Sequence, residues 1–238
     1  MSRRCRFSRL RTTVVLAAIA AVSTVAPRAA PDAADRDACD AALPVRWIDG
    51  WLAPATVLDA ADRESSRIWA SAGVALEWRP SPPGGGISPD EILVMVRTRL
   101  DGQGSADAHG RHRKTLGRLL LASPEQPTRL IEVALPEIAA QVSGQRLLDR
   151  PVRDLPKLAR DAAIGRGLGR VVAHEIGHWL FGRGHAPDGL MRASIRRGDL
   201  IGAQPPPLPS DWPSTARARL QARRPCPAPR IVRQPVAS

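Results

Sequence analysis

The sequence has 238 residues, of which 43% are hydrophobic, and a formal net charge of +12. This length and composition fit one folded domain with short appendages, because domains commonly contain about 100 to 200 residues. So basic a chain raises nucleic acid as a partner, but the arginines are scattered and aromatic residues make up only 3% of the sequence. Because it has no basic stripe with interleaved aromatic residues, no nucleic-acid partner is expected.

Residues 1–30 have the pattern of an export signal. Several arginines up to Arg11 precede an apolar run over residues 12–26, and this run is short for a membrane span. We therefore predict a secreted or periplasmic protein that loses residues 1–30 and has no stable membrane insertion afterwards. A signal that is not cleaved would leave the chain anchored in the membrane. Residues 31–44 are predicted to be a polar lead to the folded part.

Cysteine usage fits the same compartment. Of the three cysteines, Cys5 lies in the export segment, which leaves Cys39 and Cys226. Proteins in oxidising compartments commonly form disulfides, and an even number of cysteines suits such pairing. The sequence therefore predicts a disulfide between Cys39 and Cys226.

Residues 45–203 contain strand-like and helix-like patterns, as expected for one α+β domain. Alternating or continuous apolar character predicts strands over residues 45–51, 74–78, 91–96, 116–122 and 129–135. The strand over residues 91–96 is apolar enough to be central in a sheet. Apolar residues at helical spacing predict helices over residues 54–71, part of 137–161, and 168–182. Residues 204–238 are predicted to form a Pro-rich tail with a short helix over residues 214–223.

The predicted helix over residues 168–182 contains a pattern typical of metal sites. His174 and His178 are four residues apart, so both lie on one helical face and can bind the same ion. Glu175 follows the first histidine and would lie beside such an ion without binding it. A carboxylate in this place can act as general base toward a water molecule on zinc. The sequence thus predicts one catalytic zinc ion, Zn2+, with Glu175 as the base.

A catalytic zinc ion needs a third protein ligand. Glu175 is the last glutamate in the chain, so a glutamate from a later segment is excluded. The donors that remain after the helix are His185, Asp188, Asp199 and Asp211. Gly182 and Gly184 permit a sharp turn that would bring His185 back under the ion. Imidazole is the more usual zinc ligand, which favours His185, while Asp188 stays open as the alternative.

These residues resemble the metzincins, a clan of zinc metallopeptidases. The matching segments are His174-Glu175-Ile176-Gly177-His178, Gly182 with His185, and Asp188-Gly189-Leu190-Met191. Three residues separate His178 from Gly182, one more than the clan's pattern has. The resemblance implies a twisted mixed sheet packed on two long helices, with the histidine pair on the active-site helix. It also implies that Met191 forms the Met-turn, an apolar floor beneath the ligands.

The resemblance further implies a zinc-dependent endopeptidase. Its substrate would be a peptide or protein that pairs with an edge strand of the sheet, for which residues 129–135 are our candidate. We expect the chain to be a monomer. Two alternatives stay open, namely an exported zinc-binding module without activity and a basic protein that binds an anionic envelope polymer or nucleic acid. An intact Glu175 gives no support to the inactive module.

Overall fold

The structure of the protein, a computed structural model, describes residues 42–79, 87–88, 90–100, 115–123, 126–147, 149–182 and 184–223. The predicted export segment and the predicted disulfide partners Cys39 and Cys226 lie outside these residues, so both remain predictions. Among the helices that the structure describes, none is long and apolar enough to cross a membrane.

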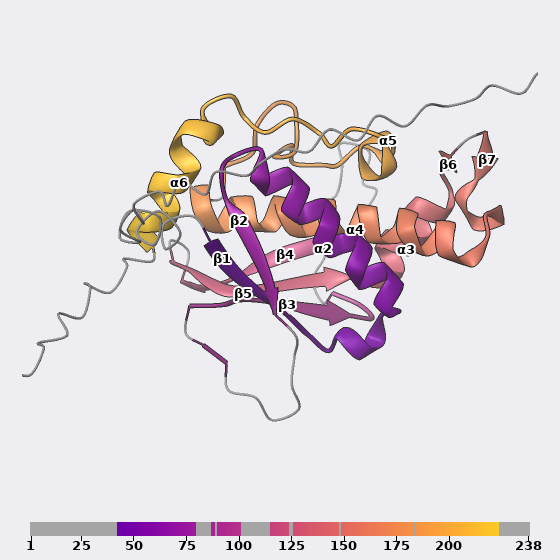
Figure 1. The fold of residues 1–238 in the computed structure, drawn as a ribbon, viewed down its shortest axis with the longest axis horizontal. Helices are drawn as coiled ribbons and strands as arrows, with labels where there is room; N and C mark the ends of the chain where they lie inside the picture. Colours follow the sequence, from indigo (N-terminus) through magenta and orange to yellow (C-terminus); the bar gives the residue numbers. More distant parts are fainter. Residues whose placement is uncertain are drawn as a thin grey trace, which may run out of the picture.

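Five strands form one twisted, mostly parallel sheet in the order β2-β1-β3-β5-β4 (Figure 1). They are β1 (Ala42–Ile48), β2 (Ala75–Arg79), β3 (Ile92–Arg97), β4 (Gly117–Ser123) and β5 (Gln126–Ala134). Within this sheet β4 is antiparallel to β5, and the other pairs are parallel. All five predicted strands are present, β3 is central as expected, and the α+β class is confirmed. Among the strands the largest displacement is that of β1, which was expected over residues 45–51. The helix expected over residues 168–182 begins much earlier, at Lys157, and ends at Phe181.

The prediction that residues 129–135 form an edge strand is wrong. Most of them belong to β5, which pairs with β3 on one side and with β4 on the other. Ile131 and Val133 are fully buried there. Only two residues separate β4 from β5 in the sequence, and their antiparallel pairing places β4 outside β5. Hydrophobic periodicity shows which residues are buried but does not show which strand ends up outermost.

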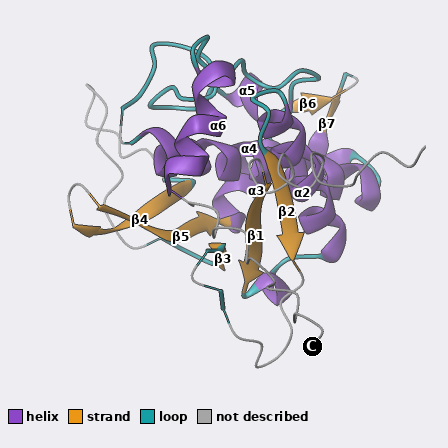
Figure 2. Cartoon of the chain, turned by 60° about the vertical axis from the view of Figure 1, so that its left-hand side comes forward, coloured by secondary structure: helices purple, strands orange, loops and turns teal. Residues whose placement is uncertain are grey.

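Two long helices, α2 (Ala55–Ala70) and α4 (Lys157–Phe181), pack against each other on one side of the sheet (Figures 1 and 2). Their apolar residues recur at helical spacing and join the inward residues of β1, β3 and β5 in one core. After α2, Gly73 adopts a φ of 70°, which favours glycine and turns the chain into β2. The core therefore lies between the sheet and these two helices.

The remaining elements are short. They are η1 (Gly50–Leu52), α3 (Leu135–Ser143), β6 (Arg146–Leu147), β7 (Arg150–Pro151), η2 (Val152–Asp154), α5 (Arg197–Ile201) and α6 (Trp212–Arg223). β6 and β7 form a separate two-stranded sheet. α6 begins two residues before the predicted start at residue 214, and Trp212, Ala216 and Leu220 are buried in the core. Part of the predicted Pro-rich tail therefore packs onto the domain.

The face of the sheet away from the helices has ion pairs between neighbouring strands. Because side chains alternate along a strand, Glu132 points away from the core that Ile131 enters. Arg97 and Arg118 contact Glu132 at 2.9 Å and 2.6 Å. Beside β3, hydrogen bonds from Arg46 hold the pKa of Glu91 below its ordinary value. Arginines on this face are thus neutralised by carboxylates within the sheet.

Close contact between α2 and α4 depends on Gly165. A Cβ atom at this position would lie 2.5 Å from the Cβ of Ala60. We expect Gly165→Ala to lower the free energy of unfolding by about 1 to 2 kcal/mol, because overpacking outweighs the better helix propensity of alanine. Urea unfolding followed by tryptophan fluorescence measures this. Gly198→Ala in α5 is the control, since its Cβ would meet nothing within 4 Å, and equal stability of the two variants would contradict the packing role.

Candidate metal centre

Helix α4 brings His174 and His178 together on one face. Their Nε2 atoms are 3.0 Å apart, and the two rings are nearly perpendicular, at 88°. His174 is buried, whereas His178 is half-buried. The helical spacing therefore produces the arrangement that the sequence predicted, with both imidazoles directed at one point.

A backbone carbonyl group determines the tautomer of each histidine. Nδ1 of His174 lies 2.7 Å from the carbonyl oxygen of Leu190, and Nδ1 of His178 lies 3.0 Å from that of Gly182. A carbonyl oxygen only accepts hydrogen bonds, so each Nδ1 has to be the protonated nitrogen. In the neutral rings both Nε2 atoms then present lone pairs, and these face each other. Two lone pairs at this distance repel unless a cation, either a proton or a metal ion, lies between them.

Burial of His174 favours a metal ion over a proton as this cation. Removal from water lowers the pKa of His174 to about 4, an effect that outweighs the hydrogen bond to Leu190. The ring is therefore neutral near pH 7, which is the form that binds metals. The outer hydrogen bond to Leu190 also orients the ring, as the second shell of a metal site does.

His185 completes a group of three histidines. α4 continues to Phe181, so the extra residue between His178 and Gly182 is accommodated within the helix. The chain then turns at Gly182, whose φ is 91°. Gly184, which was expected to share the turn, is not among the glycines with positive φ. One ring nitrogen from each of His174, His178 and His185 lies within 4.8 Å of the others, so the three could hold a metal ion.

Asp188, the alternative third ligand, is exposed and is not part of this group. Its neighbours form a closed turn in which the amide of Ala186 donates to the carbonyl oxygen of Met191 at 2.8 Å. In the same turn Gly189 has a φ of 69° and approaches Pro207 closely, and the amide of Leu190 donates to the carbonyl oxygen of Pro207 at 2.8 Å. The carbonyl group that orients His174 is therefore held in place from both sides.

Met191 is 1% exposed and packs against α4 at Gly177, the residue before His178. Its Sδ atom would lie 2.6 Å from a Cβ at Gly177, so only glycine at residue 177 leaves room for it. This is the region in which the resemblance places a Met-turn. The apolar contact is present, and a role for Met191 in metal binding remains a prediction.

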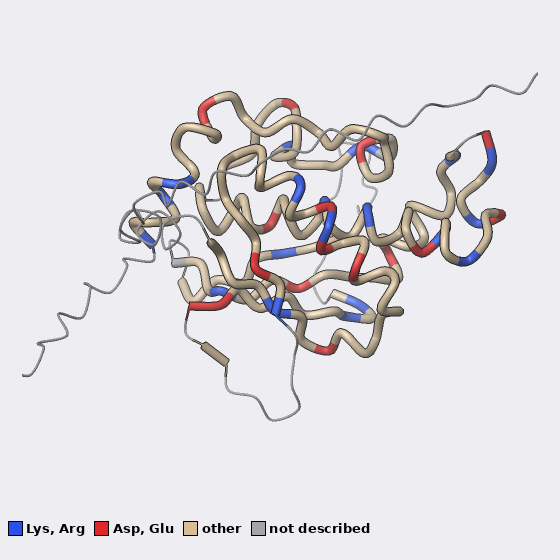
Figure 3. The backbone as a smooth tube through the Cα atoms, in the orientation of Figure 1, with Lys and Arg blue, Asp and Glu red and all other residues tan. Residues whose placement is uncertain are grey.

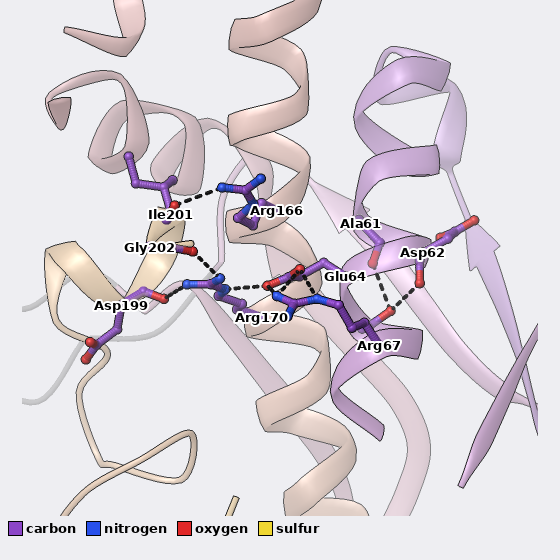
Figure 4. Close-up of polar contacts among 10 residues, drawn as sticks. Ala61, Asp62, Glu64, Arg67, Arg166, Arg170, Asp199, Ile201 and Gly202 are labelled. Atoms are coloured by element: carbon purple, nitrogen blue, oxygen red, sulfur yellow. Dashed lines mark hydrogen bonds and ion pairs between the residues drawn. The ribbon is translucent and has the colours of Figure 1, made fainter. Parts of the chain in front are cut away.

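One residue at the base of the site was missed by the sequence analysis. Arg170, one helical turn before His174, is fully buried and donates to Glu64 on α2 at 2.6 Å (Figure 4). It also donates to the carbonyl oxygens of Asp199 and Gly202, both at 2.6 Å. The signal was a charged residue within an apolar helical stretch, matched by Glu64 at a core-facing position of α2. Arg170 thus ties α4 to α2 and to the segment that leads to Pro207.

The side chain of Glu175 points from α4 toward the edge strand β4. It is 6% exposed, and a Cβ at Gly117 would lie 3.3 Å from its Cγ. Burial raises the pKa of Glu175 to about 8, although a hydrogen bond from the backbone of Leu119 opposes the shift. Glu175 is not part of the three-histidine group. Its carboxyl group is therefore close to the histidine pair in sequence but belongs to the side of the helix that faces β4.

Comparison with known proteins adds no family to this description. No protein-family model matches the sequence, and no curated protein matches it. The chemistry of the site therefore has to be inferred from its donor atoms. These are three imidazole nitrogens, two from α4 and one from the segment that follows it.

The histidine group makes a specific prediction for metal binding. We expect His174→Ala, His178→Ala and His185→Ala each to weaken zinc binding by more than about 100-fold, since losing outer-shell partners alone costs 10- to 100-fold. Asp188→Ala should leave the affinity nearly unchanged. Competition against a chelating dye measures all four variants of the full chain. A strong loss in Asp188→Ala with none in His185→Ala would make the third ligand a carboxylate.

Proposed function

We propose that the protein is a zinc-dependent endopeptidase of metzincin-like kind. The strongest support is the geometry of His174 and His178 on α4. The Nδ1–H group of each ring donates to a backbone carbonyl oxygen. Their two Nε2 lone pairs then face each other 3.0 Å apart. Such a pair needs a cation, and Glu175 stands next to it in the sequence. Export from the cell and a monomeric state are proposed with it, from the sequence alone.

The donor set fits zinc. Three neutral imidazoles bind Zn2+ at about 2.0 to 2.1 Å, and in a tetrahedral site their nitrogens are about 3.3 Å apart. The observed separations, 3.0 Å for the pair and within 4.8 Å for all three, require only a small movement of the exposed His185. When bound, a zinc ion with three protein ligands lowers the pKa of a water molecule in its fourth position to about 7.

Glu175 has the properties of the general base in this proposal. Its buried carboxyl group has a pKa raised toward the neutral range, where a group can both accept and release a proton. It would accept the proton of the attacking water and pass it to the amine that leaves the cleaved peptide bond. The hydrogen bond from Leu119 keeps the carboxyl group oriented along β4.

The edge strand β4 is our proposed binding site for the peptide, in place of residues 129–135. β4 pairs with β5 on one side, and within the described part of the chain no strand pairs with its other side. An extended peptide can bind such an edge through backbone hydrogen bonds. Because Glu175 contacts the strand at Gly117 and Leu119, a peptide on β4 would bring a backbone amide close to it.

Replacement of Glu175 separates metal binding from turnover. Glu175→Gln should keep stoichiometric zinc and lose hydrolysis of a peptide substrate by more than about 100-fold, since general-base catalysis commonly contributes 100- to 10,000-fold. Metal analysis and a fluorogenic peptide assay on the same preparation measure both quantities. The control is Glu77→Gln, an exposed residue of β2 that should change neither. Full activity in Glu175→Gln would show that another group is the base.

A further inference from the structure

Three arginines converge at the C-terminal end of α4 and form what we call the arginine cluster, Arg129, Arg219 and Arg223. The guanidinium carbon atoms of Arg129 and Arg223 lie 5.8 Å and 5.2 Å from the ring centre of Trp179. That of Arg219 lies 5.3 Å from the ring centre of Phe181. One arginine comes from β5 and two from α6, so segments far apart in the sequence build this cluster.

The arginine cluster has more positive than negative charge. Burial and the neighbouring charges of Arg219 and Arg129 lower the pKa of Arg223. Asp90, an exposed carboxylate 3.4 Å from Arg129, is the acidic partner that the structure shows. Within the described residues, neither Arg219 nor Arg223 has an ion pair. The cluster differs in this respect from the arginines on the other face of the sheet, which share the buried carboxylates of Glu91 and Glu132.

The arginine cluster lies next to the proposed peptide site. Trp179 directly follows the ligand His178, and it lies one helical turn beyond Glu175 on the same face of α4. Arg129 is on β5, the partner strand of β4, and α6 lies over the same end of the sheet (Figures 2 and 3). Leu119, whose backbone donates to Glu175, pairs with Ile131 of β5, and Arg129 lies two residues before Ile131 on that strand. The cluster is thus about two residues along the strand from Glu175.

We propose that the arginine cluster binds a carboxylate of the peptide substrate, so that the enzyme prefers peptides with an acidic side chain about two residues from the cleaved bond. This inference rests on the proposed function and names the class of substrate. Guanidinium groups bind carboxylates through paired hydrogen bonds. Arg219 and Arg223 have no carboxylate partner among the described residues, so they can bind a carboxylate of the substrate.

The aromatic rings in the cluster argue against a nucleic acid as the ligand. Single-stranded nucleic acids stack their bases on open aromatic faces. Trp179 is only 2% exposed. Phe181 stacks on Trp212 at 3.8 Å, and Arg219 lies over its ring. No open ring face is thus available at these two residues, and the cluster offers charge alone.

The test uses the zinc-loaded full chain and pairs of fluorogenic peptides that differ only by Asp or Asn two residues to either side of the cleaved bond. On one side of the cleaved bond, we expect the Asp peptide to have a KM about tenfold lower than that of its Asn partner. A hydrogen bond to a charged group contributes about a factor of ten in affinity. Arg219→Gln with Arg223→Gln should abolish this preference by raising the KM of the Asp peptide to that of the Asn peptide. The matched control, Arg150→Gln with Arg153→Gln, removes two exposed charges from β7 and η2 and should keep the preference.

Binding to the Glu175→Gln variant separates this inference from the proposed function. Fluorescence anisotropy should show the same tenfold preference for the Asp peptide without turnover. Arginine-dependent binding in a protein that cleaves neither peptide would contradict the endopeptidase and support the cluster. Cleavage with equal KM for Asp and Asn peptides would overturn the cluster's role and leave the endopeptidase standing. Displacement of the Asp peptide by a single-stranded oligonucleotide at lower concentration than by unlabelled peptide would also overturn it.

Discussion

The hydrogen bond from Nδ1 of His174 to the carbonyl oxygen of Leu190 is the contact on which the site depends. It joins α4 to the turn that holds Met191, and it fixes which nitrogen of His174 faces His178. The amide of Leu190 in turn donates a hydrogen bond to the carbonyl oxygen of Pro207, which holds this residue in place. Without this bond the ring could present either nitrogen, and the two lone pairs would no longer be directed at one point.

Helix α4 carries several buried polar groups close to this site. Arg170, His174 and Glu175 are all buried in the middle of the domain. Each is tolerated because it has hydrogen-bond partners, which for Arg170 are Glu64 and two carbonyl groups. Breaking a buried ion pair by removing one partner costs about 3 to 5 kcal/mol. The carbonyl groups that Arg170 binds lie in the segment that leads to Pro207. Pro207 contacts Leu190, and Leu190 orients His174, so Arg170 supports the orientation of His174 as well as the core.

Much of this structure could be predicted from the sequence, because local patterns report local structure. Period-two and helical spacings indicated five strands and the helices α2 and α4, and the four-residue spacing indicated the pair His174 and His178. Features that depend on contacts between residues far apart in the sequence could not be predicted in this way. The hairpin between β4 and β5 decides which strand is the edge, and the ion pair of Arg170 with Glu64 joins residues 106 positions apart. The arginine cluster likewise forms only when β5, α4 and α6 come together.

We propose that His174, His178 and His185 bind one zinc ion through three imidazole nitrogens. X-ray absorption at the zinc edge, on the full chain loaded with one equivalent of zinc, measures the ligands directly. We expect three imidazole nitrogens at about 2.0 to 2.1 Å, with one further light-atom ligand from solvent. Two or fewer imidazoles, or a carboxylate in place of the third, would contradict the assignment of His174, His178 and His185.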